Sequence, residues 1–372
     1  MSAALHDIAS LLERRYPSAW AVAGDRVGLE VGDPRQTVAA VLVALEVTPA
    51  VIHEARQRGA QLLLTHHPLL YQPLKDLRED RPGGRLVADL VRAGLALISC
   101  HTNLDIAPGG LNDFLAQRLE LSQVEVLTPT TTDPWYKLVV FVPRGHEDRV
   151  RQTLGDAGLG VIGAYTHCAF LTPGQGTYRP GPGARPFQGE MGALARADEF
   201  RLEVLAPASL LPTALARLQE THPYEEVAYD LYPVRHPGTP LGLGRIGVWP
   251  EARPFSRVAA AVKAVFAVET IQVWGRQPRM VQRLALCSGS GGDLVDNARQ
   301  QGAQVYLTGE VRNHQIPPGF GEEFAVLAVG HFASEAVYME PWAGELRDLF
   351  REAGLSLEVM AAGTMAPPYD YL

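Results

Sequence analysis

The sequence predicts an α/β protein in which two related halves form a layered α/β sandwich and a separate α+β domain is inserted between them. Apolar strand-like segments alternate with amphipathic helical segments toward both ends of the chain, a nonapeptide from the first half recurs in the second, and polar proline-containing segments flank the middle. The 372 residues exceed the usual length of one domain. The expected boundaries are residues 1–128, 129–237 and 238–372.

The first half shows the alternation most clearly. Val38–Val47 is an apolar segment rich in valine that only Glu46 interrupts, after which Pro49 opens a helical segment that Gly59 closes. The segment QLLLT then gives the next strand, and RLVADLVRAG and LALISCH repeat the order of helix and strand. Apolar segments of this length, joined by helices, indicate strands covered on both faces, as in a parallel or mixed sheet.

An internal repeat relates the two ends of the chain. Gly59–His67 reads GAQLLLTHH, and Gly302–Glu310 reads GAQVYLTGE. Each half then reaches a second strand that ends in a histidine, with His101 closing ALISCH and His331 closing VLAVGH. Two related half-domains that pack face to face would bring these strand ends together.

The middle of the chain has a different pattern. LTPTTTDPW and RHPGTPLG are expected linkers, and between them lie hairpin-like strands, a glycine- and proline-rich excursion and one helix, ASLLPTALARLQETHP. Four residues here could in principle bind a ligand, but they show no convincing ligand spacing and we assign them no chemistry: Arg179, His222, Glu225 and Glu226.

Composition limits the classes of function. The formal net charge is -8, from 33 basic and 41 acidic residues, which argues against nucleic acid or an anionic membrane as a partner. The three cysteines are far apart and odd in number, which fits a reducing compartment and small buried thiols rather than disulfides or a thiolate zinc site. The N-terminal segment resembles an amphipathic helix and no apolar segment reaches membrane-spanning length, so we expect a cytoplasmic protein.

The strand-end histidines are the main candidates for chemistry. His66 and His67 follow the strand QLLLT at the carboxyl edge of the expected sheet, where open α/β sheets commonly bind ligands. Adjacent residues of an extended segment point in opposite directions, so each histidine could hold a different ion of a pair. A single strand-end histidine is more often bonded to backbone carbonyls, but two in succession, with two more at equivalent strand ends, favour a metal site.

Acidic residues complete the pattern. Asp105 follows His101 by four residues, and Glu335 follows His331 by four, a spacing that places both side chains on one helical face. Imidazoles flanking a carboxylate that bridges two cations are typical of two-metal hydrolases. Without a thiolate, such ligands suit zinc, iron, manganese, cobalt or nickel, and the sequence does not choose among them.

Three further features have two interpretations each. His101 either orients a ligand and moves a proton, as a catalytic residue, or is a buried, hydrogen-bonded histidine. SGSGG, Ser288–Gly292, either presents free backbone N–H groups to a phosphate or is a tight strand-to-helix turn. His314 is either a pocket residue or a surface residue.

At LLLTHHP, HTNLD, TGE and GHFASE the sequence resembles the NIF-three family, whose members are also described as GTP cyclohydrolase I type 2 homologs. The resemblance covers essentially the whole chain, including DRVGLEVG, ALEVTP and the GSGG turn. The inserted region is similar to the domain of the longer bacterial members, which resembles the PII and CutA signalling proteins and is ferredoxin-like. Two positions depart from the family, with Glu46 where aspartate is common and Arg26 where asparagine is usual.

The resemblance implies a dinuclear site. In it, His66, Asp105 and Glu335 would hold one metal, while His67, His331 and Glu335 would hold the other. It also implies a homohexameric toroid, a dimer of trimers, with the sites facing the central cavity.

Three hypotheses for the function follow. The first is a metal-dependent hydrolase that acts on a nucleotide or a related phosphorylated or heterocyclic small molecule. The second is a non-enzymatic, metal-binding toroidal scaffold or regulator, whose insert senses a small molecule. The third, an enzyme of single-stranded nucleic acid, is disfavoured by the acidic balance.

Overall fold

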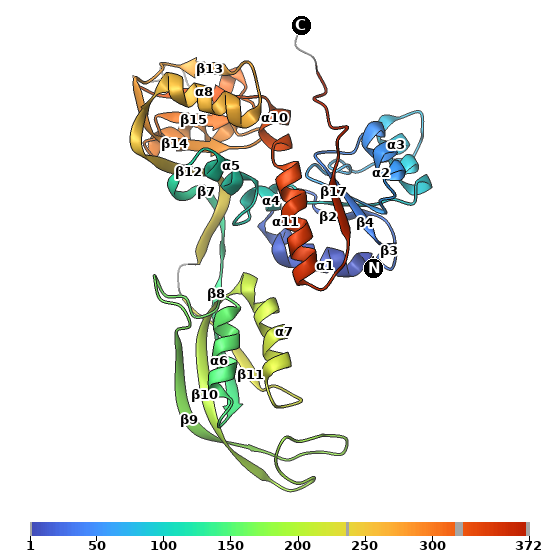
Figure 1. Cartoon of the computed structure of the whole chain (residues 1–372), viewed down its shortest axis with the longest axis vertical. Coiled ribbons are helices and arrows are strands. Elements are labelled where there is room, and N and C mark those ends of the chain that lie inside the picture. Colours follow the sequence, from blue (N-terminus) through green and yellow to red (C-terminus); the bar gives the residue numbers. More distant parts are fainter. Residues whose placement is uncertain (1, 236–237, 317–322, 370–372) are drawn as a thin grey trace. The chain divides into compact units, whose positions relative to one another are not determined.

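The chain divides into two units, of which one is inserted in the other. The computed structural model describes residues 2–235, 238–316 and 323–369. The first unit consists of Met1–Thr131 and Leu241–Leu372, and the second is Thr132–Pro240 (Figure 1). The expected linker RHPGTPLG includes residues 236 and 237, which lie outside the described residues.

The first half of the first unit is built on a five-stranded sheet with the order β17-β4-β5-β6-β2. Neighbouring strands are parallel except β2, which is antiparallel to β6. The strands are β2 (Gly28–Val31), β4 (Ala40–Ala44), β5 (Leu62–Thr65), β6 (Ala96–Ser99) and β17 (Glu358–Ala361). The helices are α1 (Leu5–Arg15), α2 (Pro49–Gln57), α3 (Pro82–Arg92), α4 (Thr102–Ile106) and α5 (Leu111–Arg118), with a 3₁₀ turn at Ser18–Trp20. A small two-stranded ladder pairs β1 (Ala3–Ala4) with β3 (Thr37–Val38).

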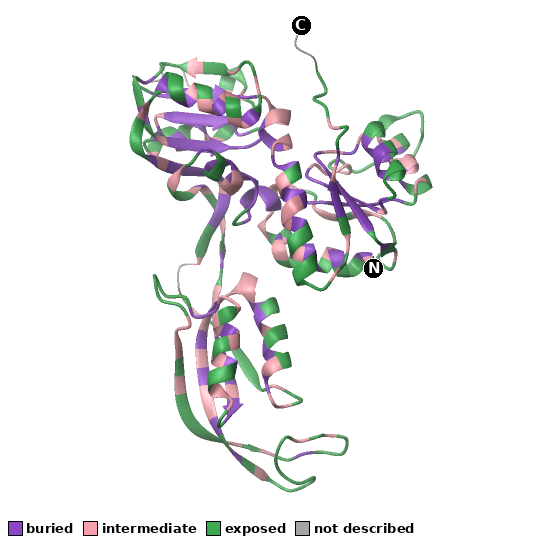
Figure 2. Ribbon diagram, in the orientation of Figure 1, coloured by how far each residue is buried: buried purple, intermediate pink, exposed green. Residues whose placement is uncertain are grey.

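The apolar segments form the buried strands predicted for them. Every residue of β4, β5 and β6 is buried, and Figure 2 shows these strands at the centre of the layers. Thr48 caps α2 by accepting a hydrogen bond from the Val51 N–H, and Pro49 occupies the first turn, where its missing N–H costs nothing. Gly59 then has φ of +67°, the left-handed conformation expected just beyond a helix end.

The second half has a six-stranded sheet with the order β13-β16-β15-β14-β12-β7. Its β14, β15 and β16 are parallel, as are β4, β5 and β6 in the first half. The strands are β7 (Ser122–Asp133), β12 (Thr239–Pro254), β13 (Gln272–Gly275), β14 (Met280–Cys287), β15 (Val305–Thr308) and β16 (Ala325–Ala328). The helices are α8 (Phe255–Phe266), α9 (Val295–Gln300), α10 (His331–Ala336) and α11 (Met339–Glu352), with 3₁₀ turns at Gly292–Leu294 and Asn313–Gln315.

One hydrophobic core joins the two halves. It includes buried residues of α1, β4, β5 and β6 together with residues of α8, β14, β15 and α11. Its largest members, Trp249 and Trp342, are fully buried. Each sheet also packs a smaller buried cluster of its own, which includes Leu42 and Leu63 in the first half and Ile246 and Tyr306 in the second.

The expected linker LTPTTTDPW spans the boundary between the two units, but it is a strand rather than an irregular segment. Most of it lies in β7, which is the outermost strand of the six-stranded sheet. Proline cannot donate a ladder hydrogen bond, and an edge strand tolerates this because one of its sides is unpaired. Pro129 and the polar threonines therefore did not prevent strand formation.

The second unit has the chain order strand, helix, two strands, helix, strand. Its antiparallel sheet has the order β11-β8-β10-β9, formed by β8 (Trp135–Pro143), β9 (Ala169–Tyr178), β10 (Ala195–Pro207) and β11 (Tyr229–Pro233). The helices α6 (Glu147–Asp156) and α7 (Leu211–Thr221) pack on one face, and a 3₁₀ turn at Ala208–Leu210 precedes α7. Alternate residues of β8 and β10 face these helices and form a core of this unit's own.

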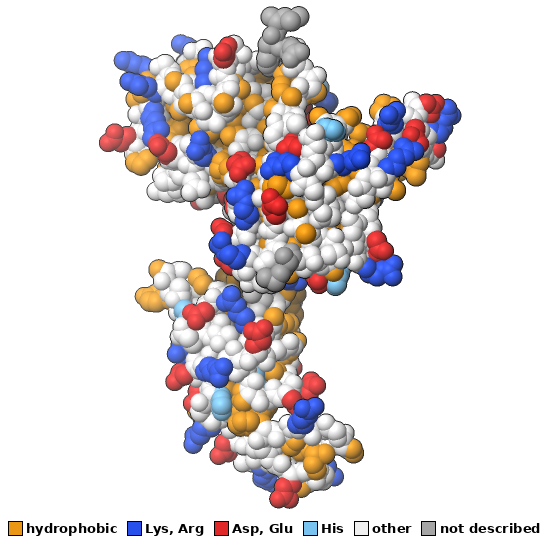
Figure 3. Space-filling model, turned by 45° about the vertical axis from the view of Figure 1, so that its right-hand side comes forward, with side chains coloured by type: hydrophobic (Ala, Val, Ile, Leu, Met, Phe, Trp, Pro, Cys, Tyr) orange, Lys and Arg blue, Asp and Glu red, His pale blue; other side chains and the backbone are white. Residues whose placement is uncertain are grey.

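Surface charge is mixed. On the face drawn in Figure 3, acidic and basic side chains are interspersed over the first unit rather than gathered by sign. Across residues 2–235, 238–316 and 323–369, no helix combines the length and the apolar composition that crossing a bilayer requires.

A buried carboxylate ties the end of the chain to the first half. Glu54 in α2 accepts hydrogen bonds from the backbone N–H groups of Gly363 and Thr364, from the Thr364 hydroxyl and from the guanidinium of Arg58. Burial alone would raise the pKa of the Glu54 carboxyl, but these donors lower it from 4.5 to about 2. The pKa of Glu54 is lower in the folded protein than in the unfolded chain. The ionised carboxylate therefore stabilises the fold fully above the unfolded-state pKa, and this stabilisation is lost as the pH falls through the folded-state pKa.

We therefore expect Glu54→Gln to lower the free energy of unfolding at pH 7 by about 1 to 2 kcal/mol, less than the full pKa shift implies because the glutamine amide oxygen still accepts part of these hydrogen bonds. The deficit should shrink as the pH falls below about 4. Urea unfolding of both proteins between pH 7 and 3.5 measures it, with Glu352→Gln, an exposed residue of α11, as the control. A deficit of the same size at every pH would contradict this account.

Candidate metal centre

Parallel strands of both sheets end at the same place. His66 and His67 directly follow β5, His101 lies two residues beyond the end of β6, and His331 follows β16 after a short turn. The turn before His331 uses Gly330 at φ of +96°, a conformation that favours glycine. The carboxyl ends of the strands thus deliver four imidazoles from two sheets to one region.

Two short helices supply the carboxylates. Asp105 lies on α4 and Glu335 on α10, and each is four residues beyond the histidine that precedes it. Asp105 is 8 % exposed and Glu335 is 3 % exposed. Carboxylates this deeply buried require opposing charge or hydrogen-bond donors.

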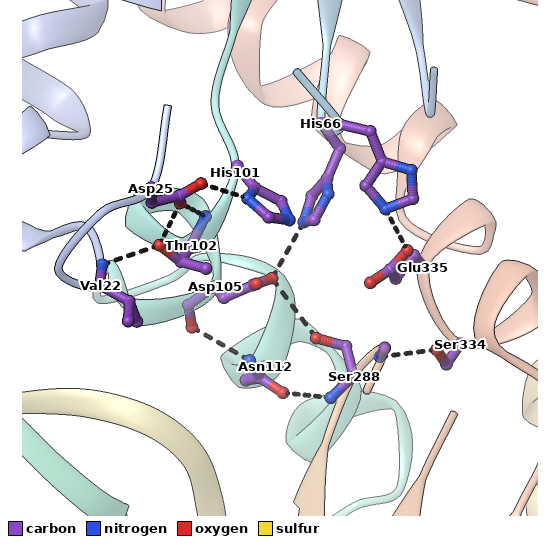
Figure 4. Close-up of polar contacts among 12 residues, drawn as sticks. Val22, Asp25, His66, His101, Thr102, Asp105, Asn112, Ser288, Ser334 and Glu335 are labelled. Atoms are coloured by element: carbon purple, nitrogen blue, oxygen red, sulfur yellow. Dashed lines mark hydrogen bonds and ion pairs between the residues drawn. The ribbon is translucent and has the colours of Figure 1, made fainter. Parts of the chain in front are cut away.

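Imidazoles lie beside both carboxylates, and one of them reaches across the boundary between the halves. Nε2 of His66 lies 3.0 Å from Oδ1 of Asp105, and Nε2 of His67 lies 2.9 Å from Oε2 of Glu335 (Figure 4). On the other side of the same carboxylate, Nε2 of His331 lies 3.2 Å from Oε2 of Glu335. Glu335 is therefore shared by a histidine of each half.

The outer ring nitrogens of three histidines face other carboxylates. Nδ1 of His101 lies 2.7 Å from Asp25, Nδ1 of His331 lies 3.2 Å from Glu310, and Nδ1 of His67 lies 3.9 Å from Glu46. A metal-binding histidine commonly presents its second nitrogen to a carboxylate, which fixes the tautomer and the ring orientation. The other ring nitrogen, Nε2, of His67, His101 and His331 therefore points toward the middle of the cluster.

Charges within the cluster depend on one another. Burial alone would lower the pKa of His67, but the carboxylates of Glu335 and Glu46 raise it to about 10. The Glu335 carboxylate raises the pKa of His331 to about 9 against the opposing effect of burial, and Glu310 adds to the rise. Burial would also raise the pKa of Glu335, yet His331 and His67 hold it well below its ordinary value. The protonated rings of His67 and His331 therefore balance the charge of Glu335, as a bound metal cation would do in their place.

Several details fit a bound metal. Oε2 of Glu335 is buried without a partner of hydrogen-bond geometry among the described residues, and so is Nδ1 of the fully buried His66. Among the residues that the structure describes, two groups of three have potential donor atoms within 4.8 Å of one another: His66, His67 and His101, and His67, His331 and Glu335. The second group is one of the sets that the family resemblance implied. The first contains His101, whereas the resemblance implied Asp105 and Glu335 beside His66.

His101 belongs to the cluster by its position. Its ring centroid lies 5.2 Å from that of His66 and 5.7 Å from that of His67. Asp25 fixes the His101 ring and also accepts hydrogen bonds from the backbone N–H and the hydroxyl of Thr102. Burial would raise the pKa of Asp25, but these contacts lower it to about 2, so the group that orients His101 is a carboxylate.

Three N–H groups of the glycine turn at Ser288–Gly292 are bonded to the protein itself. The N–H of Ser288 donates to Asn112, that of Gly289 to Ser334, and that of Gly291 to Thr308. These N–H groups are not free for a phosphate, and the turn instead closes against the cluster. Gly289 has φ of +59°, and a Cβ there would overlap Oε1 of Glu335.

A cavity of about 570 Å³ opens beside the cluster. His67, His101, Asp105, His331 and Glu335 line it, together with Pro68, Tyr71 and the glycine turn. This volume suits a small-molecule ligand.

The structure decides between the two interpretations of His314 and shows site residues that sequence reasoning missed. His314 is a surface residue, exposed in the turn at Asn313–Gln315, and it does not line this cavity. Asp25, Glu310 and Asn112 were not recognised as part of the site. Asp25 and Glu310 lie in the motifs DRVGLEVG and TGE, which carried the family resemblance and could have marked both as site residues. No sequence pattern indicated Asn112.

Comparison with known proteins identifies the family of the chain. The family model Duf34/NIF3 (NGG1p interacting factor 3) matches residues 3–368. A Bacillus subtilis protein named "GTP cyclohydrolase 1 type 2 homolog" is 38% identical over 98% of both chains, and one of the same name from Mycobacterium tuberculosis is 35% identical over 100% of this chain and 97% of its own.

Solved structures show the same fold over the full length. A Bacillus cereus protein related to NIF3 superposes with a TM-score of 0.83 at 36% identity, covering 100% of this chain and 99% of that one. Staphylococcus aureus protein SA1388 superposes with a TM-score of 0.70 at 25% identity and with the same coverage. The extent of both kinds of match, together with the histidine and carboxylate motifs that carried the resemblance, shows that this chain belongs to the Duf34/NIF3 family.

Proposed function

We propose that the protein is a hydrolase that uses two divalent cations and acts on a nucleotide or a related phosphorylated or heterocyclic small molecule. The observation that carries the proposal is the sharing of buried Glu335 between His67 and His331, with His66 and Asp105 paired beside it. The name of the relatives, which refers to GTP cyclohydrolase, supports a heterocyclic or nucleotide-like substrate.

The donor set indicates which residues would hold the cations. We assign His66, Asp105 and Glu335 to one and His67, His331 and Glu335 to the other, because Glu335 is the carboxylate within reach of both halves. Imidazole and carboxylate donors suit zinc, iron, manganese, cobalt or nickel. Bound cations would supply Lewis-acid polarisation of a phosphoryl or carbonyl oxygen and would lower the pKa of the attacking water.

The protein's own residues handle the proton. Asp25 accepts the Nδ1 hydrogen of His101, which leaves Nε2 free to accept or return a proton at the cavity wall. We therefore assign His101 the catalytic role of moving a proton, with Asp25 as its positioning residue. The adjacent ring of Tyr71, 6.2 Å from His101, borders the same space and would restrict how a substrate enters it.

Metal content and turnover test the proposal together. Untagged wild-type protein should carry about two metal ions per chain by elemental analysis, and Glu335→Gln should lose both because the shared ligand is removed. Glu340→Gln, an exposed residue of α11, should keep the wild-type content.

Turnover is screened on the same preparations with nucleotides and phosphoesters. Wild-type protein should hydrolyse at least one of them, and Asp105→Ala should abolish the rate with the fold retained by circular dichroism. Fully loaded wild-type protein that is inert toward the whole panel would reject the hydrolase proposal, and a metal-free wild type would reject the metal assignment.

A second variant tests the role of the glycine turn. Gly289→Ala should lower metal affinity by at least about tenfold, because the new Cβ displaces the Glu335 carboxylate. Calorimetric titration of the metal-depleted protein measures the change. Gly344→Ala in α11, where a Cβ meets only ordinary contacts, should leave the affinity unchanged. Unaltered binding by Gly289→Ala would show that Glu335 is not held by this turn.

The assembly and the inserted unit are further parts of the proposal. We propose a cytoplasmic homohexamer, so sedimentation should give six copies of the 40.4 kDa chain, and a monomer would reject it. We propose a ferredoxin-like, PII/CutA-like fold for the insert, supported by its chain order and its strand order β11-β8-β10-β9. An experimental structure with another strand order would reject that classification.

A further inference from the structure

The second unit contains a cavity that the metal-centred proposal does not use. It has a volume of about 480 Å³, in the range of small-molecule sites. Residues of β8, β9 and β10, the loop after β9 and the segment after α7 form its walls (Figure 1). Those that matter for binding are Phe141, Tyr178, Arg179, Phe187, Glu199 and Tyr224.

The cavity lies on the sheet face turned away from α6 and α7. Leu202 and Val204 of β10 pack against those helices, so Glu199, an odd-numbered residue of the same strand, lies on the other face. Phe141 pairs with Arg201 across the ladder, and Tyr178 pairs with Ala195, so both share the face of Glu199. The pairing register of β8, β9 and β10 therefore places Phe141, Tyr178 and Glu199 on one face of the sheet.

Glu199 is the unusual member of this group. It is 9 % exposed, yet no Lys, Arg or His within the described part of the chain lies within ion-pairing distance of it. Its Oε1 accepts a hydrogen bond from the Tyr224 hydroxyl at 2.9 Å, and its carboxylate packs against Gly176, where a Cβ would overlap it. A buried carboxylate whose described hydrogen bond comes from a neutral hydroxyl is costly unless a ligand supplies positive charge.

Aromatic rings line the same cavity around Tyr224, the residue that binds the Glu199 carboxylate. The Tyr224 centroid lies 6.3 Å from that of Tyr178 and 5.9 Å from that of Phe187, and the ring planes are inclined by 61° and 49°. His222 fixes this arrangement, because its Nδ1 accepts the Tyr224 N–H and its Nε2 donates to the Phe141 carbonyl. Burial lowers the pKa of His222, which favours the neutral ring that this pair of bonds requires.

The remaining charges set the sign of the site. Glu225 and Glu226 also line the cavity, and the Glu225 carboxylate accepts the Arg185 N–H at 2.6 Å. Arg179 is the basic residue of the lining, so carboxylates outnumber it. The cavity therefore favours a cation, and Arg179 offers a contact for an acidic group carried by the same molecule.

We propose that this cavity binds a small organic cation, an amine, guanidinium or alkylammonium group, held between the rings of Tyr178, Phe187 and Tyr224 beside the carboxylate of Glu199. Aromatic faces attract a cation through their quadrupole, and a buried carboxylate supplies the opposite charge. The motifs GQGTYRP and HPYEEV, to which the sequence alone assigned no chemistry, supply Tyr178, Arg179 and Tyr224 to this site.

Calorimetric titration of the full-length protein tests the site with four probes: choline, agmatine, L-arginine and 3,3-dimethylbutanol, the neutral analogue of choline. We expect at least one cation to bind with a dissociation constant below about 10 mM and the neutral analogue not to bind. Stronger binding of L-arginine than of agmatine would assign the carboxylate contact to Arg179, and the reverse order would assign the site to simple cations.

Two variants locate the binding. Glu199→Gln should lower the affinity for the cation by about tenfold. Glu203→Gln, on the same strand and face but outside the cavity, should leave the affinity unchanged. If Glu199→Gln fails to fold, Phe187→Leu tests the location of the site instead. Phe187 is 51 % exposed, so its replacement should leave the fold intact while lowering the affinity for alkylammonium about fivefold. No binding of any cation by wild-type protein, equal binding of the neutral analogue, or wild-type affinity in both folded variants would overturn the proposal.

Discussion

The arrangement of the first unit depends on one buried carboxylate. Glu335 is almost fully removed from solvent, and the groups that compensate its charge come from different sheets, His67 from the first half and His331 from the second. A carboxylate in such surroundings is unfavourable unless positive groups approach it closely. The two halves can therefore satisfy Glu335 only when the carboxyl ends of their parallel strands face each other.

Other contacts also join the carboxyl ends of the strands of the two halves. Asn112 donates to the Asp105 carbonyl and accepts the N–H of Ser288, so it joins the first carboxylate helix to the glycine turn of the second half. The guanidinium of Arg245, itself buried, pairs with Asp113 and donates to backbone carbonyls on both sides, including Ile106 and Gly244. A buried guanidinium with this many acceptors fixes the backbone around it, so the site rests on a rigid support.

The two units handle buried negative charge in different ways. In the first, each carboxylate of the cluster meets imidazoles of the protein itself, and their number and spacing suit metal ions. In the second, Glu199 accepts a hydrogen bond from a tyrosine hydroxyl in a cavity lined by aromatic rings, a setting that suits a cation brought by a ligand. The difference follows from the residues near each carboxylate, histidines at strand ends in one unit and aromatic residues on a sheet face in the other.

The sequence by itself determined the buried strands, the repeat and the principal site residues, because these signals are local. Apolar β-branched segments predict strands, GAQLLLTHH and GAQVYLTGE align by inspection, and a histidine with an acid four residues on marks a helical face. Tertiary structure alone decided that LTPTTTDPW is an edge strand, that the N–H groups of Ser288, Gly289 and Gly291 are already bonded, and that Asn112 reaches the site. It also decided the surroundings of Glu199. Each of these depends on a partner distant in the chain, and local propensity carries no information about which distant group will occupy the neighbouring space.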